Sequence, residues 1–263
     1  MRYNIAMELS KPQKYIARVS DSYYLTENKH FLLVKFELVQ PDRFSFLAGQ
    51  YVSIKVHENG ERRSYSIVST PDDNHGFEIV AEMVPKGMGS MYLAKLKPGD
   101  AIEVLAPLGR FVVNTPLNLP GRQAGQSTIK PLENKLLFVA TGTGIAPVYS
   151  MINDLLINRH ETRAMRLHWG MKSEQNLFWF DNFERLEEEH TNFVFDPVLS
   201  SPSEEWDLCT GHVQDCLKRD FGKEGLRDWE AYICGNPKMV EGVMELVQQL
   251  GVMPEAVHHE KFT

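Results

Sequence analysis

The segment KLLFVATGTGIAPVYSMI, residues 135–152, combines residue types that could hold a phosphate group. An apolar run typical of a buried strand leads into Thr141, Gly142, Thr143 and Gly144, and a helical apolar face follows. Gly142 and Gly144 would let a pyrophosphate approach the backbone, and the helix N-terminus would offer it unpaired amides. Pro147 suits the first helical turn, where a missing N–H costs nothing. A tight strand-to-helix turn also contains glycines for conformational reasons alone, and that alternative stays open.

A second segment, RRSYSIVST at 62–70, alternates polar and aromatic residues as a strand would. Strand periodicity predicts Arg63 and Tyr65 on one face and Ser64 and Ser66 on the other. An arginine beside an aromatic ring could hold a phosphate and a flat ring together. The alternative is an ordinary barrel strand with a surface arginine and a half-buried tyrosine.

The elements that would position these segments fall into two groups with different patterns. Up to residue 113 the sequence predicts short strands separated by turn formers, which is typical of an antiparallel β-barrel or sandwich, with one helical interval at 89–96. From residue 135 buried strands alternate with helices, which predicts a parallel, Rossmann-like α/β sheet. The polar segment 114–134 separates the two and is interpreted as a linker or lid. The predicted domains are therefore 1–113 and 135–263.

Composition limits the functions that this chain of 263 residues can have. Its formal net charge of −7 argues against nucleic-acid binding. No apolar stretch approaches the roughly 20 residues that cross a bilayer, and residues 1–15 lack the pattern of a secretory signal, so we expect a cytoplasmic protein. Three cysteines, Cys209, Cys216 and Cys234, are too few for the four ligands of an iron–sulfur cluster and fit reduced thiols better than a disulfide framework.

Seven motifs in order resemble those of the ferredoxin–NAD(P)H reductase superfamily, and the resemblance spans nearly the whole chain. They are FLAGQYV (46–52), RSYS (63–66), GMGS (87–90), PGDAIEVLAPLGRF (98–111), ATGTGIAP (140–147), ICGNPKM (233–239) and the terminal EKFT. The resemblance implies an FAD-binding barrel followed by an NAD(P)-binding α/β domain.

The resemblance also implies roles for the matching residues on the FAD side. Arg63 would pair with the FAD pyrophosphate, Tyr65 would stack on the isoalloxazine, and Ser66 would bond near the hydride-accepting nitrogen. Backbone amides and a hydroxyl at a helix start would support the pyrophosphate. The implied FAD-binding residues are Arg63, Ser64, Tyr65, Ser66, Gly87, Gly89 and Ser90.

On the nicotinamide side the resemblance implies a second set of residues: Thr141, Gly142, Gly144, Pro147, Lys172, Cys234 and Gly235. The implied catalytic residues are Ser66, Cys234, Glu260 and Phe262. Cys234 is alternatively a small core residue, and Phe262 a hydrophobic plug on a terminal strand. His258 and His259 lack further ligand spacing, so we expect them to be exposed and expect no metal site.

The implied function is an FAD-dependent reductase that takes hydride from NAD(P)H and passes electrons to a separate carrier, ferredoxin or flavodoxin. The alternatives are a reductase of small acceptors such as free flavin, ferric complexes or quinones, or a non-autonomous electron-transfer subunit. NADH is favoured over NADPH, because the region after RLHWG offers Lys172 and little else for a 2′-phosphate, and Ser173 suits either. A basic docking rim for the carrier, or scattered solubilising charges, could be formed by Lys11, Lys14, Arg62, Lys86, Lys95 and Lys97.

Overall fold

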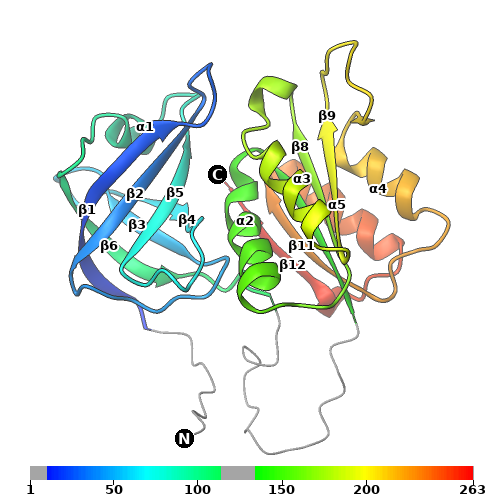
Figure 1. Ribbon diagram of the computed structural model, residues 1–263, viewed down its shortest axis with the longest axis horizontal. Helices are drawn as coiled ribbons and strands as arrows, with labels where there is room; N and C mark the ends of the chain where they lie inside the picture. Colours follow the sequence, from blue (N-terminus) through cyan, green and yellow to red (C-terminus); the bar gives the residue numbers. More distant parts are fainter. Residues whose placement is uncertain (1–10, 114–133, 263) are drawn as a thin grey trace, which may run out of the picture.

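Two sheets of different kinds divide the chain, as Figure 1 shows. The structure is a computed structural model that describes residues 11–113 and 134–262. The predicted linker or lid at 114–134 lies outside the described residues, apart from Asn134.

The first sheet is an antiparallel barrel of six strands in the order β4-β3-β6-β1-β2-β5. A bridge between Ile67 and Ile79 joins the continuation of β4 to β5 and closes the barrel. Buried and exposed residues alternate along strands such as β1, so the side chains of one face point inward and form the apolar core of the barrel. The elements are β1 (Gln13–Tyr24), β2 (Phe31–Gln40), β3 (Tyr51–Lys55), β4 (Arg62–Ser66), β5 (Gly76–Glu82), α1 (Met88–Leu93) and β6 (Ala101–Leu108).

The second sheet is parallel, with six strands in the order β10-β9-β8-β7-β11-β12. Its strands are β7 (Lys135–Thr141), β8 (Met165–Met171), β9 (Phe193–Leu199), β10 (Cys209–Thr210), β11 (Trp229–Gly235) and β12 (Val257–Lys261). Its helices are η1 (Gly142–Gly144), α2 (Ile145–Asn153), η2 (Asp154–Asn158), η3 (Glu174–Asn176), α3 (Phe180–Glu189), α4 (Val213–Phe221), α5 (Pro237–Gln249) and η4 (Pro254–Ala256). The predicted barrel and parallel α/β sheet are both confirmed.

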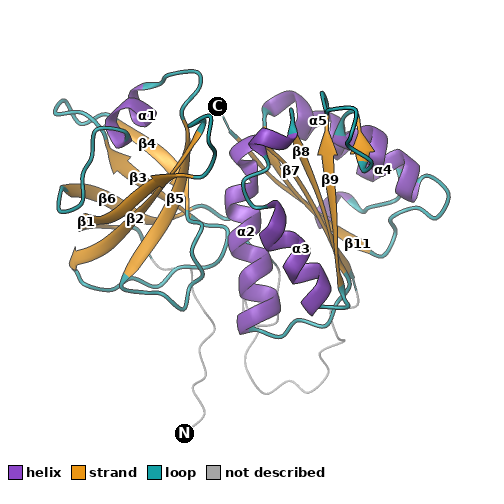
Figure 2. Cartoon of the chain, turned by 45° about the horizontal axis from the view of Figure 1, so that its top comes forward, coloured by secondary structure: helices purple, strands orange, loops and turns teal. Residues whose placement is uncertain are grey.

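Helices cover both faces of the parallel sheet, with α2 and α3 on one side and α4 and α5 on the other (Figure 2). The central strand β7 is buried on both faces. Leu136 and Phe138 pack on the α2 side, and Leu137 and Val139 pack on the α4 side. This explains why KLLFVA reads as a continuous apolar run rather than an alternating one.

The helix α2 lies between the parallel sheet and the barrel (Figure 1). One apolar cluster runs through this boundary and includes Phe31, Val68 and Phe111 of the barrel region together with Val148 and Met151 of α2. Both domains therefore share a single core at their interface.

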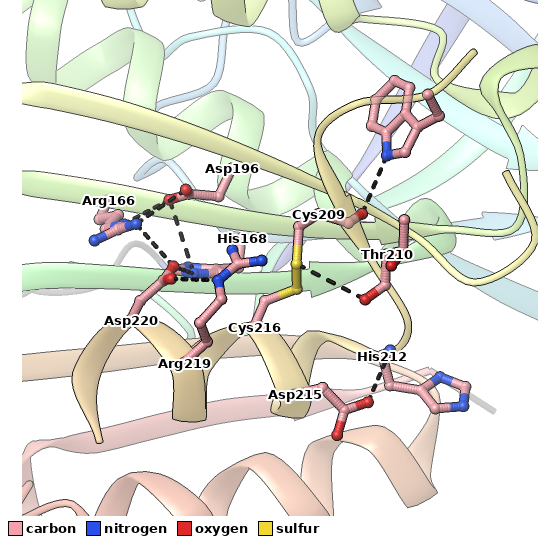
Figure 3. Close-up of a disulfide and its surroundings, with 11 residues drawn as sticks. Arg166, His168, Asp196, Cys209, Thr210, His212, Asp215, Cys216, Arg219 and Asp220 are labelled. Atoms are coloured by element: carbon pink, nitrogen blue, oxygen red, sulfur yellow. Dashed lines mark hydrogen bonds and ion pairs between the residues drawn. A yellow bond between two sulfur atoms is a disulfide. The ribbon is translucent and has the colours of Figure 1, made fainter. Parts of the chain in front are cut away.

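The cysteine expectation is wrong for two of the three residues. Cys209 and Cys216 form a disulfide that joins β10 to α4 (Figure 3), whereas Cys234 is free and buried. The chain reverses at Gly211, whose φ is +104°, and this brings the two Cα atoms to 6.5 Å. Sequence spacing alone does not reveal such a reversal.

A partly buried charge network lies beside the disulfide and ties α4 to β8 and β9 (Figure 3). Asp220 accepts from His168 Nε2 at 3.0 Å and from Arg166 Nη2 at 2.8 Å, and Arg166 also binds Asp196. Hydrogen bonds from His168 and Arg219, together with the Arg166 charge, lower the pKa of Asp220 to about 2. Ligand-type atoms of His168, Asp196 and Asp220 lie within 4.8 Å of one another, but the Arg166 guanidinium already binds both carboxylates.

We expect Asp220→Asn to lower the free energy of unfolding by about 1.5–3 kcal/mol near neutral pH, the range for hydrogen bonds to a charged group. Because the fold lowers this pKa from 3.8 to about 2, the stabilisation is complete above about pH 5 and is lost progressively as the pH falls from there toward about 1. Urea unfolding at pH 7 and pH 3 measures the difference in unfolding free energy between the variant and wild type. Asp207→Asn, which changes an exposed aspartate, is the control. A difference from wild type that does not shrink at pH 3 would contradict the assignment.

Candidate cofactor site

The strand β4 and the start of α1 form one side of the site. Arg63 and Tyr65 lie on the face of β4 that α1 covers, since a Cβ on Gly89 would collide with the Tyr65 hydroxyl and press on Arg63 Cγ. Glycine at this position therefore allows the helix to approach the strand. Burial raises the pKa of Tyr65 to about 12, so its phenol stays neutral.

Arg63 keeps a half-exposed guanidinium at this face. It donates to the Arg62 carbonyl at 2.8 Å and lies 3.8 Å from the Glu61 carboxylate. Such loose surface pairing leaves the charge free to bind an anion. Ser64 is exposed, whereas Ser66 is buried and its Oγ has no hydrogen-bond partner within the described residues.

The GMGS turn supports the start of α1 in a way the motif alone does not specify. The Gly87 amide donates to Ser90 Oγ at 3.0 Å, and Ser90 Oγ donates to the Gly87 carbonyl at 3.1 Å. The Ser90 hydroxyl therefore caps the helix, and the anion-binding capacity of this turn rests mainly on its backbone amides.

The other side of the site is the carboxyl end of the parallel sheet, where β7 and β11 are neighbours. A Cβ on Gly144 would collide with the Cys234 carbonyl, and a Cβ on Gly235 would collide with Thr141 Oγ1. Gly142 and Gly235 have φ angles of +57° and +150°. The structure thus brings together four of the predicted residues from segments ninety residues apart in sequence.

Trp169 holds the Gly142 turn from the next strand, because its Nε1 donates to the Gly142 carbonyl at 3.3 Å. This buried side chain was not among the predicted site residues. Its position at the end of the RLHWG strand, next to the predicted glycine turn, is the sequence feature from which it could have been predicted. Pro147 lies in the first turn of α2, as predicted.

Cys234 and Glu260 face each other in the register of β11 and β12. Burial raises the pKa of the Cys234 thiol, and the Glu260 charge raises it further. Burial also raises the pKa of Glu260 to about 7. Cys234 is therefore a neutral thiol rather than a nucleophilic thiolate, and Glu260 can hold or release a proton near neutral pH.

Phe262 follows β12 and stays at the same end of the sheet. Its amide donates to the Gly235 carbonyl at 2.9 Å, and its half-buried ring packs against the interface core. The preceding histidines differ from the expectation that both are exposed. His259 is exposed, but His258 is half-buried and stacks on Tyr232 with 4.7 Å between ring centroids.

Lys172 lies beyond the end of β8, the strand next to β7 in the sheet. It is exposed after β8, and its carbonyl accepts from the Ser201 amide at 2.8 Å. Glu174 lies two residues further on, and its Oε1 accepts from the Ser203 amide at 2.7 Å. This bond lowers the pKa of Glu174, so a negative charge stands beside the single predicted cation.

Two of the predicted cofactor-binding residues have a buried hydroxyl that lacks a partner among the residues that the structure describes. Within the described residues, Ser66 Oγ in the barrel and Thr141 Oγ1 in the parallel sheet have no hydrogen-bond partner. Buried polar atoms are nearly always paired in native proteins, so an orphaned hydroxyl indicates a missing ligand or water. Each of the two predicted cofactor segments contains one.

Comparison with known families finds two domain models in the chain. Residues 18–113 match the oxidoreductase FAD-binding domain, and residues 138–245 match the oxidoreductase NAD-binding domain. The chain belongs to the ferredoxin–NAD(P)H reductase superfamily. The predicted FAD and nicotinamide cofactors are confirmed by these two domains of the reductase fold.

Individual relatives of this superfamily member are reductase components. The chain is 30% identical over 221 residues to the aromatic O-demethylase reductase subunit of an Amycolatopsis species, covering 83% of this chain and 61% of that protein. It is 32% identical over 221 residues to the phenol 2-monooxygenase reductase component of a Pseudomonas species, covering 82% and 58%. The chain thus spans about 60% of the length of these relatives.

Among solved structures, the cytochrome P450 reductase GcoB of Amycolatopsis superposes with a TM-score of 0.82 and 27% identity, covering 96% of this chain and 70% of that one. Within residues 11–113 and 134–262 of this reductase-superfamily chain, no helix is long and apolar enough to cross a membrane.

We expect Gly144→Ala to abolish nicotinamide-driven flavin reduction while FAD stays bound. The added methyl would push the glycine turn at 142–144 away from Cys234, and a displacement of 1 Å costs about 100-fold in rate. The FAD content and the rate of NADH-driven bleaching measure the two effects. Gly242→Ala in α5, which meets the flexible Gln214 side chain, is the control. A reduction rate equal to that of Gly242→Ala would contradict the assigned turn.

Proposed function

We propose that this protein is an FAD-dependent reductase that takes hydride from NADH and passes electrons to a separate acceptor protein. The observation that carries the proposal is the pair of orphaned hydroxyls, Ser66 Oγ and Thr141 Oγ1, one in each matched cofactor domain. Bound FAD would supply the conversion from two-electron hydride chemistry to single-electron transfer. The protein contributes binding, alignment and exclusion of water.

On the FAD side, the half-exposed Arg63 guanidinium anchors the pyrophosphate together with the backbone amides of the GMGS turn. Tyr65 offers a neutral aromatic face, and Ser66 offers an uncommitted hydroxyl. On the nicotinamide side, the glycine turn at 141–144 and the start of α2 receive the second pyrophosphate.

The end of β11 and the residues of β12 close the reacting region. Cys234 is fully buried and neutral, and so excludes water without competing as a nucleophile. Glu260 can hold a proton near neutral pH, because its pKa is about 7. Phe262 is tied to Gly235 through its amide, so its ring stays beside the nicotinamide-binding residues.

NADH is the proposed hydride donor. An NADPH site needs cations around the 2′-phosphate, at the end of the second strand of the nucleotide fold. That region carries Lys172 but also Glu174, which is fixed to the Ser203 amide and ionised. Glu204 and Glu205 follow, both exposed. Like charges placed against a phosphate cost binding free energy.

The test is anaerobic stopped-flow mixing of the FAD-loaded protein with NADH and with NADPH. We expect NADH to bleach the flavin with a kcat/KM at least about tenfold higher, a difference of about 1.4 kcal/mol. Glu174→Lys should raise the kcat/KM for NADPH, because it replaces repulsion by attraction. Glu188→Lys, on the exposed face of α3, is the control. A flavin that neither nucleotide reduces would refute the proposed function, and faster reduction by NADPH would refute the donor assignment.

The acceptor is proposed to be a ferredoxin or flavodoxin, since the relatives reported above are reductase components. The six cations of the predicted rim do not act alike. Lys14 and Arg62 both approach Glu103, at 4.0 and 2.7 Å, and their charge is compensated there. Lys86, Lys95 and Lys97 are exposed along the segment 83–99, which contains no Asp or Glu.

This segment also exposes apolar side chains. Val84, Met88 and Met91 are 50%, 43% and 37% exposed around α1, which itself contacts the FAD-side residues. An apolar centre with exposed lysines that form no ion pair within residues 11–113 and 134–262, in a chain of net charge −7, suits an acidic carrier protein. A small-acceptor reductase would not need such a surface.

We expect the double variant Lys86→Glu, Lys95→Glu to raise KM for an acidic ferredoxin or flavodoxin about tenfold at low ionic strength, and less at high salt. NADH-driven reduction of a small neutral quinone should stay unchanged. Lys218→Glu, Lys223→Glu in the other domain is the matched control. If both double variants change KM for the carrier protein equally, the docking surface lies elsewhere. If the protein reduces the quinone rapidly but reduces neither ferredoxin nor flavodoxin, the small-acceptor alternative is favoured.

A further inference from the structure

Within the described residues, a part-buried side-chain hydrogen bond that belongs to neither cofactor site joins the two domains. Ser150 of α2 is fully buried, and its Oγ donates to the carbonyl oxygen of Ser69 at 2.7 Å. A serine inside a helix usually bonds to a carbonyl of its own helix four residues earlier. Here the hydroxyl instead reaches a backbone atom 81 residues away in sequence.

The two ends of this bond are short extensions of the two cofactor segments. Ser69 follows Ser66, the last residue of β4, by three residues. Ser150 follows the Gly144 turn by six residues along α2, or about 9 Å at 1.5 Å per residue. The bond therefore connects the FAD-side strand to the helix whose N-terminus faces the nicotinamide dinucleotide.

The acceptor belongs to a rigid segment. The Ile67 amide donates to the Gln50 carbonyl at 3.0 Å, and the Val68 amide donates to the Glu78 carbonyl at 2.8 Å. The Ser69 hydroxyl in turn accepts from the Glu78 amide at 3.2 Å. Because the barrel holds this segment on both sides, its position is fixed relative to β4.

The neighbouring residue of α2 also meets the barrel at close range. A Cβ on Gly49 would collide with Met151 Cε and with the Phe111 carbonyl, and Gly49 has a φ of +98°. This contact sets how near α2 approaches the barrel, but apolar packing is non-directional and resists sliding only weakly. A hydrogen bond needs both distance and angle, so Ser150 selects one position of α2 along the barrel surface.

We infer that Ser150 is a positioning residue, whose hydrogen bond to the Ser69 carbonyl sets the alignment of the two cofactor sites for hydride transfer. Hydride transfer requires reacting atoms within about 3–3.5 Å, and a 1 Å error costs about 100-fold. Ser150 belongs to neither cofactor site, so its loss should affect alignment more than affinity. The inference rests on the proposed reductase function.

The test compares Ser150→Ala and Ser150→Cys with wild type. For Ser150→Ala we expect the limiting rate of flavin bleaching at saturating NADH to fall at least about tenfold, with FAD content and the Kd for NADH within about twofold of wild type. The long-wavelength absorbance of the stacked flavin–nicotinamide complex should fall with it. Ser150→Cys keeps a side chain of similar size with a weak hydrogen-bond donor, so its limiting rate should lie between those of wild type and Ser150→Ala. Hydrogen exchange without NADH should be faster at 67–70 in Ser150→Ala.

Asn176→Ala is the matched control, because it removes the exposed interdomain hydrogen bond from Asn28 Nδ2 to Asn176 Oδ1 at 3.0 Å. Water can replace an exposed bond, so its hydride-transfer rate should match wild type. An unchanged rate in Ser150→Ala would overturn the inference, as would a rate loss that follows loss of FAD or of NADH affinity in both Ser150 variants. Wild-type protein that NADH does not bleach would refute the proposed function instead.

Discussion

The close approach of two backbone segments at the carboxyl end of the parallel sheet is the constraint on which the cofactor site depends. Gly144 lies directly against the Cys234 carbonyl, and Gly235 lies against Thr141. Side chains at either glycine would separate β7 from β11 at the point where both strands end. Close packing between the strand ends therefore accounts for Gly144 and Gly235, and the approach of a phosphate to the TGTG turn stays part of the proposed function.

A second constraint is the arrangement of α2. Its N-terminus follows the glycine turn, one side packs on the parallel sheet, and the other side packs on the barrel. A single helix thus belongs to the nucleotide site and to the domain interface at once. Two-domain enzymes often move their domains freely, but here the core is continuous across the boundary, and the Ser150 hydrogen bond adds direction to it.

Most of the fold could be predicted from local pattern, because barrel strands alternate and buried parallel strands form apolar runs. β10 has only two residues and carries no period that a pattern could reveal. The burial of His258 depends on its register opposite Tyr232 in the neighbouring strand. For the site, RSYS and TGTG were visible because each is a short local motif, of alternating polar and aromatic residues in one case and of glycines between a buried strand and a helix in the other. Ser150 was not, since no spacing rule links a helix residue to a carbonyl in another domain.

The disulfide between β10 and α4 has a topological consequence. It closes a covalent ring over residues 209–216, which includes the Gly211 reversal and the first turn of α4. A backbone cut inside this ring would leave both pieces of the protein joined through sulfur. Proteolytic nicking there would therefore go unseen on a denaturing gel run without reductant and would appear only after reduction, as two fragments divided between β10 and α4.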